Sequence, residues 1–159
     1  MPSTASLADL IRRGGVYYNI GGSGPTEALK EAVRAIALPK EVDRERLLAA
    51  VLEREALMPT AIGNGVAIPH PRNPIISDPA LQRVAVFFLK TPVSYNALDR
   101  KPVSALFLIL SADARSHLGV LATLSHLCQS ADFIDFLASR PSTEELTSRI
   151  ASAEASWRS

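Results

Sequence analysis

The sequence contains a single cysteine, Cys128, among its 159 residues. One cysteine excludes an internal disulfide, so nothing in the chain requires an oxidising compartment. Long apolar runs are also absent. The longest, residues 84–89 and 105–110, fall far short of the roughly 20 residues that a membrane-spanning helix needs. We therefore expect no direct insertion into a membrane.

An excess of charge of one sign is lacking too, because 17 Lys and Arg stand against 16 Asp and Glu and give a formal net charge of +1. Without a basic block, the composition does not predict nucleic-acid binding. The N-terminus has no charged start followed by an apolar core. No signal peptide is therefore expected, and a cytoplasmic location is the default.

Motifs for nucleotide and metal chemistry are missing. The chain has no Gly-x-x-x-x-Gly-Lys-Ser/Thr loop, which predicts that it does not use ATP itself. It has no acidic cluster that would hold magnesium, and no His or Cys pair close in sequence of the kind that zinc sites use. We therefore expect neither a cofactor nor a metal ion.

The apolar residues that are present indicate a globular chain, since they make up 47% of it and charged residues 21%. The apolar runs at residues 83–89 and 104–111 are bounded by polar loops, as central strands covered on both faces are. Val16–Ile20 predicts another strand, and residues 91–93 a short extra piece. Helical spacing predicts helices at residues 6–13, 25–37, from 43 onward, 112–128, 133–137 and around 146–150.

Helices and strands therefore interleave, which predicts an α/β fold in one domain, residues 1–159, with a mixed central sheet and helices packed on both faces. The prolines and glycines between residues 59 and 79 exclude a long helix there. Residues after Ala151 are expected to form a frayed end unless Trp157 docks.

The segment of residues 54–72 stands apart because it places His70 between Pro69 and Pro71. Each proline fixes its own φ, and Pro71 pushes His70 toward extended geometry. A stiff backbone suits a nucleophile, because less ordering is needed when a partner docks. A histidine that merely ends a strand in a proline-rich loop is the alternative, and the residues alone leave both open.

Other residues of this segment could bind an anion. Gly63 and Gly65 permit positive φ, so neighbouring amides could point at an anion. Arg54 and Arg72 could pair with phosphoryl oxygens, since a guanidinium binds such groups through two hydrogen bonds. A solvated arginine at the end of a helix is the other interpretation of Arg54.

The positions of the other two histidines around their predicted helix indicate which of them could lie near a site. His117 and His126 lie nine residues apart on one predicted helix, about half a turn out of phase, so they cannot face one site. His117 falls near the start of that helix, where free N–H groups and the helix dipole favour an anion. We expect His126 to be a surface or packing residue, and Cys128, on the apolar face, an inert packing cysteine.

The segment resembles the active-site stretch of enzyme IIA domains of the bacterial phosphoenolpyruvate-dependent sugar phosphotransferase system, of the fructose/mannitol class that includes nitrogen-regulatory relatives. The shared features are an Arg-Glu pair, a threonine, a glycine pair and an Ala-Ile-Pro-His run. They lie here at Arg54-Glu55, Thr60, Gly63 and Gly65, and Ala67-Ile68-Pro69-His70. The Asp99–Val103 loop, the strand after it and His117 at the head of a helix also resemble the family, from about Ser6 to Ile150.

The resemblance implies a protein-histidine phosphotransferase. His70 would accept a phosphoryl group from the phosphocarrier HPr or its nitrogen-branch counterpart, and His117 would hydrogen-bond that group or the reactive ring. We assign Arg54 to neutralising phosphoryl oxygens and Thr60 to donating a hydroxyl. The acceptor would be a cysteine of an enzyme IIB domain.

A regulatory module is the alternative, in which phosphorylation of His70 sets the choice of a target protein. The absence of an IIB or membrane segment from these 159 residues slightly favours that alternative. Met58-Pro59, Ser116 and Lys101 depart from the usual family residues, which concerns the choice of partner more than the chemistry. A shallow apolar rim around His70 is expected from Leu57, Met58, Ile62 and Ile76, although these residues could instead close the core.

Overall fold

The computed structural model describes residues 5–158, and within them five strands form one mixed sheet. The strands are β1 (Val16–Ile20), β2 (Ala61–Gly63), β3 (Val66–Ala67), β4 (Arg83–Val93) and β5 (Val103–Leu110). Their order across the sheet is β1-β4-β5-β3-β2. The pairs β1–β4 and β3–β5 are parallel, whereas β4–β5 and β2–β3 are antiparallel.

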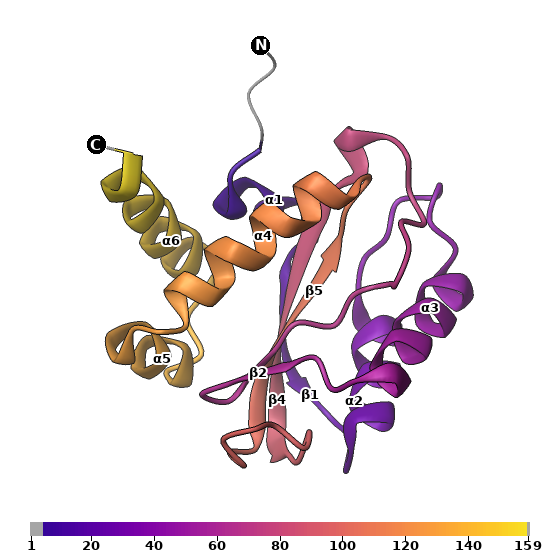
Figure 1. Ribbon diagram of the computed structural model, residues 1–159, viewed down its shortest axis with the longest axis horizontal. Coiled ribbons are helices and arrows are strands. Elements are labelled where there is room, and N and C mark those ends of the chain that lie inside the picture. The colour runs from indigo at the N-terminus through magenta and orange to yellow at the C-terminus, as the bar shows by residue number, and fades with distance from the viewer. Residues whose placement is uncertain (1–4, 159) are drawn as a thin grey trace.

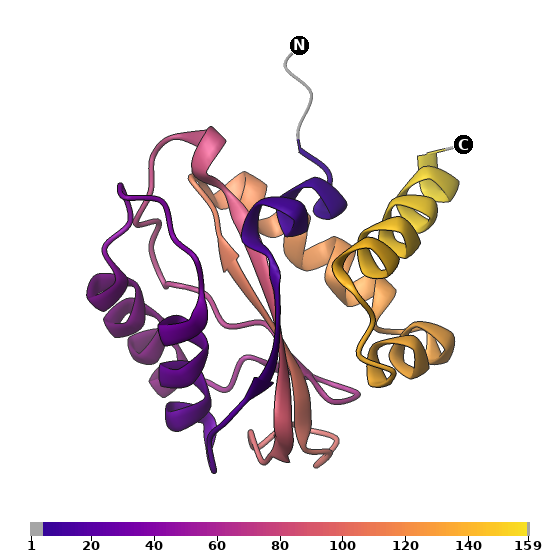
Figure 2. The same cartoon turned by 180° about the vertical axis from the view of Figure 1, so that it is seen from behind.

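Helices cover both faces of this sheet (Figure 1). They are α1 (Leu7–Gly14), α2 (Pro25–Ala35), α3 (Arg44–Leu57), the 3-10 helix η1 (Pro79–Leu81), α4 (Ala114–Leu127), α5 (Ala131–Ala138) and α6 (Thr143–Arg158). The pair α2 and α3 lies on one side of the sheet, and α1, α4, α5 and α6 lie on the other, as the view from behind also shows (Figure 2). The predicted α/β fold is confirmed.

The two apolar runs form the centre of the sheet because alternate side chains enter two separate cores. Toward α1, α4, α5 and α6, the strand β4 contributes Val84, Val86 and Phe88. Toward α2 and α3 it contributes Ala85, Phe87 and Leu89. The strand β5 alternates in the same way, so both strands are buried on both faces, as predicted.

Most predicted elements are confirmed with shifted ends. Residues 91–93 belong to β4 rather than to a separate piece, and the pairing of β4 with β5 is irregular between Phe88 and Val93. Helix α2 ends at Ala35 because Ile36 is already extended. Strand β2 and its turn to β3 were not predicted, although Asn64-Gly65 is a hairpin signal.

The described part of the tail is not frayed, since α6 continues to Arg158 and Trp157 docks, which is the exception that the prediction allowed. The buried carboxylate of Glu154 accepts hydrogen bonds from the amides of Leu7 at 3.1 Å and Ala8 at 3.3 Å. The Trp157 ring packs edge-on against His126, with centroids 4.5 Å apart. These contacts fasten the last turns of α6 to α1 and α4. Ser159 lies outside the described residues.

Candidate active site

His70 follows directly on the part of the sheet where β3 runs beside β5. The amide of Ile109 in β5 donates to the carbonyl of Pro69 at 3.0 Å, so backbone pairing continues up to the residue before His70. The ring Nδ1 lies 2.7 Å from the carbonyl oxygen of Ile68. Because a carbonyl oxygen only accepts, this bond places the proton on Nδ1. The neutral ring then carries its free electron pair on Nε2, which is the form a nucleophile needs.

His117 reaches the same place from the first part of α4. The centroids of the His70 and His117 rings are 4.4 Å apart, and the ring planes are tilted by 53°. Both side chains are half-buried. His126 is exposed and packs on Trp157 instead. The structure therefore brings His70 and His117 together and leaves His126 elsewhere, as the helical phasing predicts.

Electrostatics hold both rings of the pair neutral. Burial lowers the pKa of His70, the hydrogen bond to Ile68 opposes that shift, and the charge of Arg54 adds to it. Burial also lowers the pKa of His117 to about 4, with His70 and Arg54 contributing in the same direction. At neutral pH the pair therefore offers one uncharged nucleophile and one uncharged hydrogen-bonding ring.

Arg54 lies in the last turn of α3, half-buried, and its Nη1 donates to the carbonyl of Met58 at 2.8 Å. The bond uses one of the five N–H donors of the guanidinium. The charge of Arg54 lowers the pKa of both histidines, so Arg54 lies within electrostatic range of the pair.

Thr60 is buried, and its hydroxyl has a partner within the protein. The hydroxyl donates to Glu55 Oε1 at 2.6 Å, and the Thr60 amide donates to Glu55 Oε2 at 2.9 Å. The Thr60 carbonyl in turn accepts from the Ile68 amide at 3.0 Å. A hydroxyl has one proton to donate, and in this arrangement that proton goes to Glu55, so the Thr60 hydroxyl is not free for the predicted hydrogen bond to a phosphoryl group. Sequence reasoning assigned no role to Glu55, although it adjoins Arg54.

The turn at Gly63-Asn64-Gly65 binds a carboxylate of the protein itself, that of Asp99. The amide of Asn64 donates to the Asp99 carboxylate at 2.7 Å. The Asn64 side chain also donates to the Cys128 carbonyl at 3.0 Å. The turn thus fastens β2 and β3 to the loop between β4 and β5 and to the end of α4. This amide is therefore not free to bind a phosphoryl group.

The start of α4 also differs from expectation. The Asp113 carboxylate caps the helix and accepts from the Ser116 amide at 2.8 Å, and the amide of His117 donates to the Asp113 carbonyl at 3.2 Å. These two amides are therefore not free to bind a phosphoryl group. The contribution of α4 to the site is the His117 ring.

Three of the four residues predicted for an apolar rim have exposed side chains, and the rim itself stays a prediction. Leu57, Met58 and Ile62 are exposed, whereas Ile76 is buried and packs in the core with α2 and α3. Leu118, next to His117, is 63% exposed and was not predicted. The exposed apolar side chains thus come from segments that also carry the site residues.

The cysteine, the possible metal ligands and the helix lengths were also the subject of predictions. Burial raises the pKa of the Cys128 thiol to about 12, which fits an inert packing cysteine. In the described chain, no three His, Cys, Asp or Glu side chains gather closely enough to hold a metal ion, and no helix is both long and apolar enough to cross a membrane.

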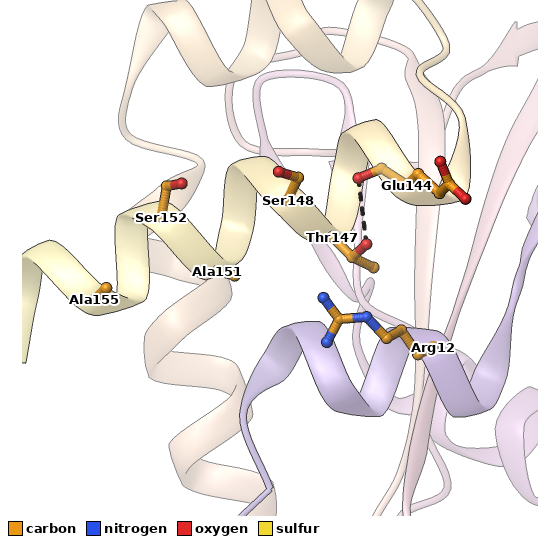
Figure 3. Close-up of a pocket in the computed structure, with 7 residues that line it drawn as sticks. All are labelled: Arg12, Glu144, Thr147, Ser148, Ala151, Ser152 and Ala155. Carbon is orange, nitrogen blue, oxygen red and sulfur yellow. Dashed lines mark hydrogen bonds between the residues drawn. The ribbon is translucent and has the colours of Figure 1, made fainter.

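The surface also has hollows away from the histidine pair. Figure 3 shows one, a hollow of about 500 Å³ in which Arg12 of α1 lies opposite small residues of α6 such as Ala151 and Ala155. Arg12 is paired there with Asp9 at 2.9 Å. The residues that line this hollow include no histidine or cysteine. A smaller cavity, of about 180 Å³, adjoins His117.

Comparison with known families agrees with this geometry. The family described as "Phosphoenolpyruvate-dependent sugar phosphotransferase system, EIIA 2" matches residues 10–153. The chain belongs to this family. The present EIIA domain is 33% identical over 144 residues to the nitrogen regulatory protein of Pseudomonas aeruginosa, covering 88% of this chain and 91% of that protein.

Solved structures give the same result. The crystal structure of the nitrogen regulatory protein IIA-Ntr from Neisseria meningitidis superposes with a TM-score of 0.73 at 27% identity, covering 85% of this chain and 92% of that one. The mannitol enzyme IIA of Escherichia coli, in complex with phosphorylated enzyme IIB, gives a TM-score of 0.62 at 20% identity, covering 86% and 94%. At that identity the likeness to the mannitol enzyme concerns the fold alone. The EIIA domain is thus a component of a phosphotransferase system, in a family with both transport and regulatory members.

Proposed function

We propose that this EIIA domain is a phosphocarrier that accepts a phosphoryl group on Nε2 of His70 from phospho-HPr or its nitrogen-branch counterpart. The observation that carries the proposal is the bond from Nδ1 of His70 to the Ile68 carbonyl beside the His117 ring. It leaves Nε2 unprotonated without a general base, and family membership supplies the class of donor.

The proposed transfer exchanges one phosphorus–nitrogen bond for another. The electron pair on Nε2 of His70 attacks phosphorus in line, and the bond to the donor histidine breaks with its electron pair returning to that ring. The proton on Nδ1 of His70 stays where it is, bonded to the Ile68 carbonyl, so no proton has to be removed. The transfer therefore depends on positioning and charge, and Arg54 with the N–H of His117 would stabilise the phosphoryl oxygens.

Onward transfer would go to a cysteine of an enzyme IIB domain. The mannitol relative was solved in complex with phosphorylated enzyme IIB, which supports that class of acceptor. Leu57, Met58 and Leu118 are exposed and lie close in sequence to Arg54 or His117, so they are the apolar side chains that we propose a docking protein covers.

The test is incubation of the whole chain with phosphoenolpyruvate, enzyme I and HPr, followed by intact mass. We expect one acid-labile phosphoryl group on the wild type and on His126→Ala, none on His70→Ala, and slower labelling of His117→Ala. Labelling of His70→Ala at the wild-type rate would contradict the proposal.

A regulatory role is the second candidate, and the similarity to nitrogen regulatory proteins supports it. A phosphoryl group adds up to roughly two negative charges beside Arg54 and His117, enough to change which protein docks. Pull-downs with the phosphorylated and unphosphorylated chain distinguish the roles: a regulator exchanges partners, whereas a relay loses its label to a IIB domain. The cytoplasmic location remains a prediction.

A further inference from the structure

A crevice adjoins the histidine pair at the point where the segments that follow β3 and β5 turn to opposite faces of the sheet. Strands β3 and β5 are parallel neighbours, and their pairing ends at Pro69 and Ile109. Beyond that point β5 leads into α4, on the face that carries α1, α5 and α6. The chain after His70 leads to Ile75 and Ile76, which pack on the opposite face with α2 and α3. In open α/β sheets, a crevice at such a divergence, outside the carboxyl ends of adjacent strands, is where ligands bind.

The structure has a cavity of about 180 Å³ at this divergence. Since a water molecule occupies about 30 Å³ in the liquid, the cavity has room for a compact organic molecule rather than an ion alone. Its apolar wall comes from the end of β5 and from the loop after His70, and includes Pro71, Pro74 and Ile109. An apolar wall with a few polar groups is the usual lining of a small-molecule site.

The polar groups of this crevice favour a carboxylate. Arg72 lines it and makes no hydrogen bond or ion pair with the described part of the chain. Asn73 and His117 add groups that can donate a hydrogen bond. Asp113 also lines the crevice, but its two carboxylate oxygens accept from the amide and hydroxyl of Ser116, at 2.8 and 3.3 Å. These bonds occupy the oxygens of Asp113 without cancelling its charge, whereas the guanidinium of Arg72 has no hydrogen-bond or ion-pair partner among the described residues, so Arg72 is the group that can pair with an anion.

We propose that this crevice binds a small organic carboxylate with a compact apolar body, and that its binding is coupled to phosphorylation of His70 through His117. The apolar part lies against Ile109 and the two prolines, and the carboxylate pairs with Arg72. His117 borders this crevice on one side and the His70 ring on the other.

The part of the proposal that couples carboxylate binding to phosphorylation rests on the proposed function. A phosphoryl dianion on His70 repels a carboxylate bound across the His117 ring, and it competes for the single N–H of that ring. Because coupling between two sites is reciprocal, a bound carboxylate lowers the phosphorylated fraction by the same factor as phosphorylation weakens its binding. The crevice would then let a metabolite adjust how much of the protein carries phosphate.

Binding is tested first, without phosphorylation, by titrating the whole chain with phenylacetate and following its isoleucine methyl resonances. We expect saturable shifts at Ile75 and Ile109. Phenylacetamide, equal in shape but uncharged, should bind about tenfold more weakly, the low end of a charge-assisted hydrogen bond. Arg72→Gln should weaken phenylacetate by a similar factor and leave phenylacetamide unchanged.

Two further variants locate the site. Ala114→Trp fills the crevice and should abolish binding, whereas Ala122→Trp, at an exposed position of the same helix outside it, should retain binding. Equal binding of acid and amide, or binding to Ala114→Trp as to the wild type, would overturn the proposal. Displacement of phenylacetate by inorganic phosphate at the same concentration would overturn it too, since it would assign Arg72 to the phosphoryl site.

Coupling is tested second, from the equilibrium between the chain and phospho-HPr. Saturating phenylacetate should lower the phosphorylated fraction of the wild type and leave that of Ala114→Trp unchanged. An unchanged wild-type fraction would refute the coupling. Failure of both proteins to accept phosphate would refute the proposed function instead, and the binding titration would still decide whether the crevice is a carboxylate site.

Discussion

Glu55 accepts two hydrogen bonds from Thr60, one from its amide at 2.9 Å and one from its hydroxyl at 2.6 Å. Thr60 accepts from the Ile68 amide, and Ile68 accepts from Nδ1 of His70. Four residues thus form a continuous chain of hydrogen bonds from the end of α3 to the reactive ring. This chain fixes both the orientation of the ring and the nitrogen that carries its proton.

Removing Glu55 should therefore disturb the site from a distance. We expect Glu55→Ala to lower the free energy of unfolding by about 1.5–3 kcal/mol, because it leaves buried donors of Thr60 without a charged partner. The rate of His70 phosphorylation should fall roughly tenfold or more through misplacement of the ring. Chemical denaturation and a phosphorylation time course measure the two effects.

The matched control is Glu53→Ala, at an exposed position on the same helix, which should behave as the wild type. Glu55→Gln keeps one carbonyl acceptor for Thr60 and should give intermediate values. If Glu55→Ala phosphorylated at the wild-type rate once folded, Glu55 would be only a structural residue.

The histidine pair should titrate at acid pH. Its burial lowers the pKa of His70 below the usual 6.5 and that of His117 to about 4. Ring C–H resonances followed by NMR should therefore show His70 turning cationic only below pH 6.5, and His117 close to pH 4. A midpoint above 6.5 for either ring would contradict the geometry described for the pair.

The same shifts predict how stability depends on pH. Below about pH 6.5 the unfolded chain binds protons on these two rings that the folded chain does not bind. The free energy of unfolding should therefore fall as the pH is lowered from 7 toward 4, and this loss should level off below the folded pKa values. His117→Asn removes one of the two groups and should show a shallower loss in denaturation curves across this range.

Trp157 and His126 should matter for stability and not for chemistry. Their rings pack edge-on at 4.5 Å between α6 and α4. Trp157→Ala should lower the free energy of unfolding by about 0.5–1.5 kcal/mol, the usual worth of such a ring pair. Phosphorylation of Trp157→Ala and of His126→Ala should proceed at the wild-type rate, and a slower rate in His126→Ala would show that His126 contributes to the site.

A substitution at Gly63 can show whether this turn only stabilises the fold or also binds the phosphoryl group. Gly63 has φ +94°, and a Cβ there would lie 3.2 Å from the Asp99 carboxylate. Gly63→Ala should cost about 1–2 kcal/mol in unfolding free energy, because a left-handed backbone is strained for any residue with a Cβ. Phosphorylation of the folded variant should persist.

Gly21→Ala is the control for that substitution, since a Cβ at Gly21 meets nothing within 4 Å. It should change the free energy of unfolding far less. Loss of phosphorylation in a Gly63→Ala protein that melts cooperatively would return this turn to the phosphate-binding site.

The sheet could be predicted from local signals, whereas the meeting of His70 with His117 was implied by the family resemblance and was consistent with the helical phasing. The apolar runs of β4 and β5 are continuous since each strand is covered twice, and helical phasing alone separates His117 from His126. The chemical roles predicted for individual residues were less accurate. The Thr60 hydroxyl is bonded to Glu55, and the amide of Asn64 is bonded to Asp99, 35 residues away.

Such hydrogen bonds depend on tertiary contacts, which the spacing of apolar residues along the sequence does not predict. Ile76 shows the same limit, because a loop residue is buried or exposed according to what packs over it, and here α2 and α3 do. The extent of α6 was missed for a related reason: Glu154 is a charged residue in a polar tail until the start of α1 gives it two amides to accept from.

That last contact also governs how the chain is made. A nascent polypeptide leaves the ribosome N-terminus first, so Leu7 and Ala8 emerge well before Glu154, which is 147 and 146 residues further along. Until Glu154 has been synthesised, α1 lacks the carboxylate that binds its first amides. The first helix therefore has to wait for the synthesis of α6 before its amides are bound, and a product truncated before residue 154 should have an α1 that proteases reach more easily.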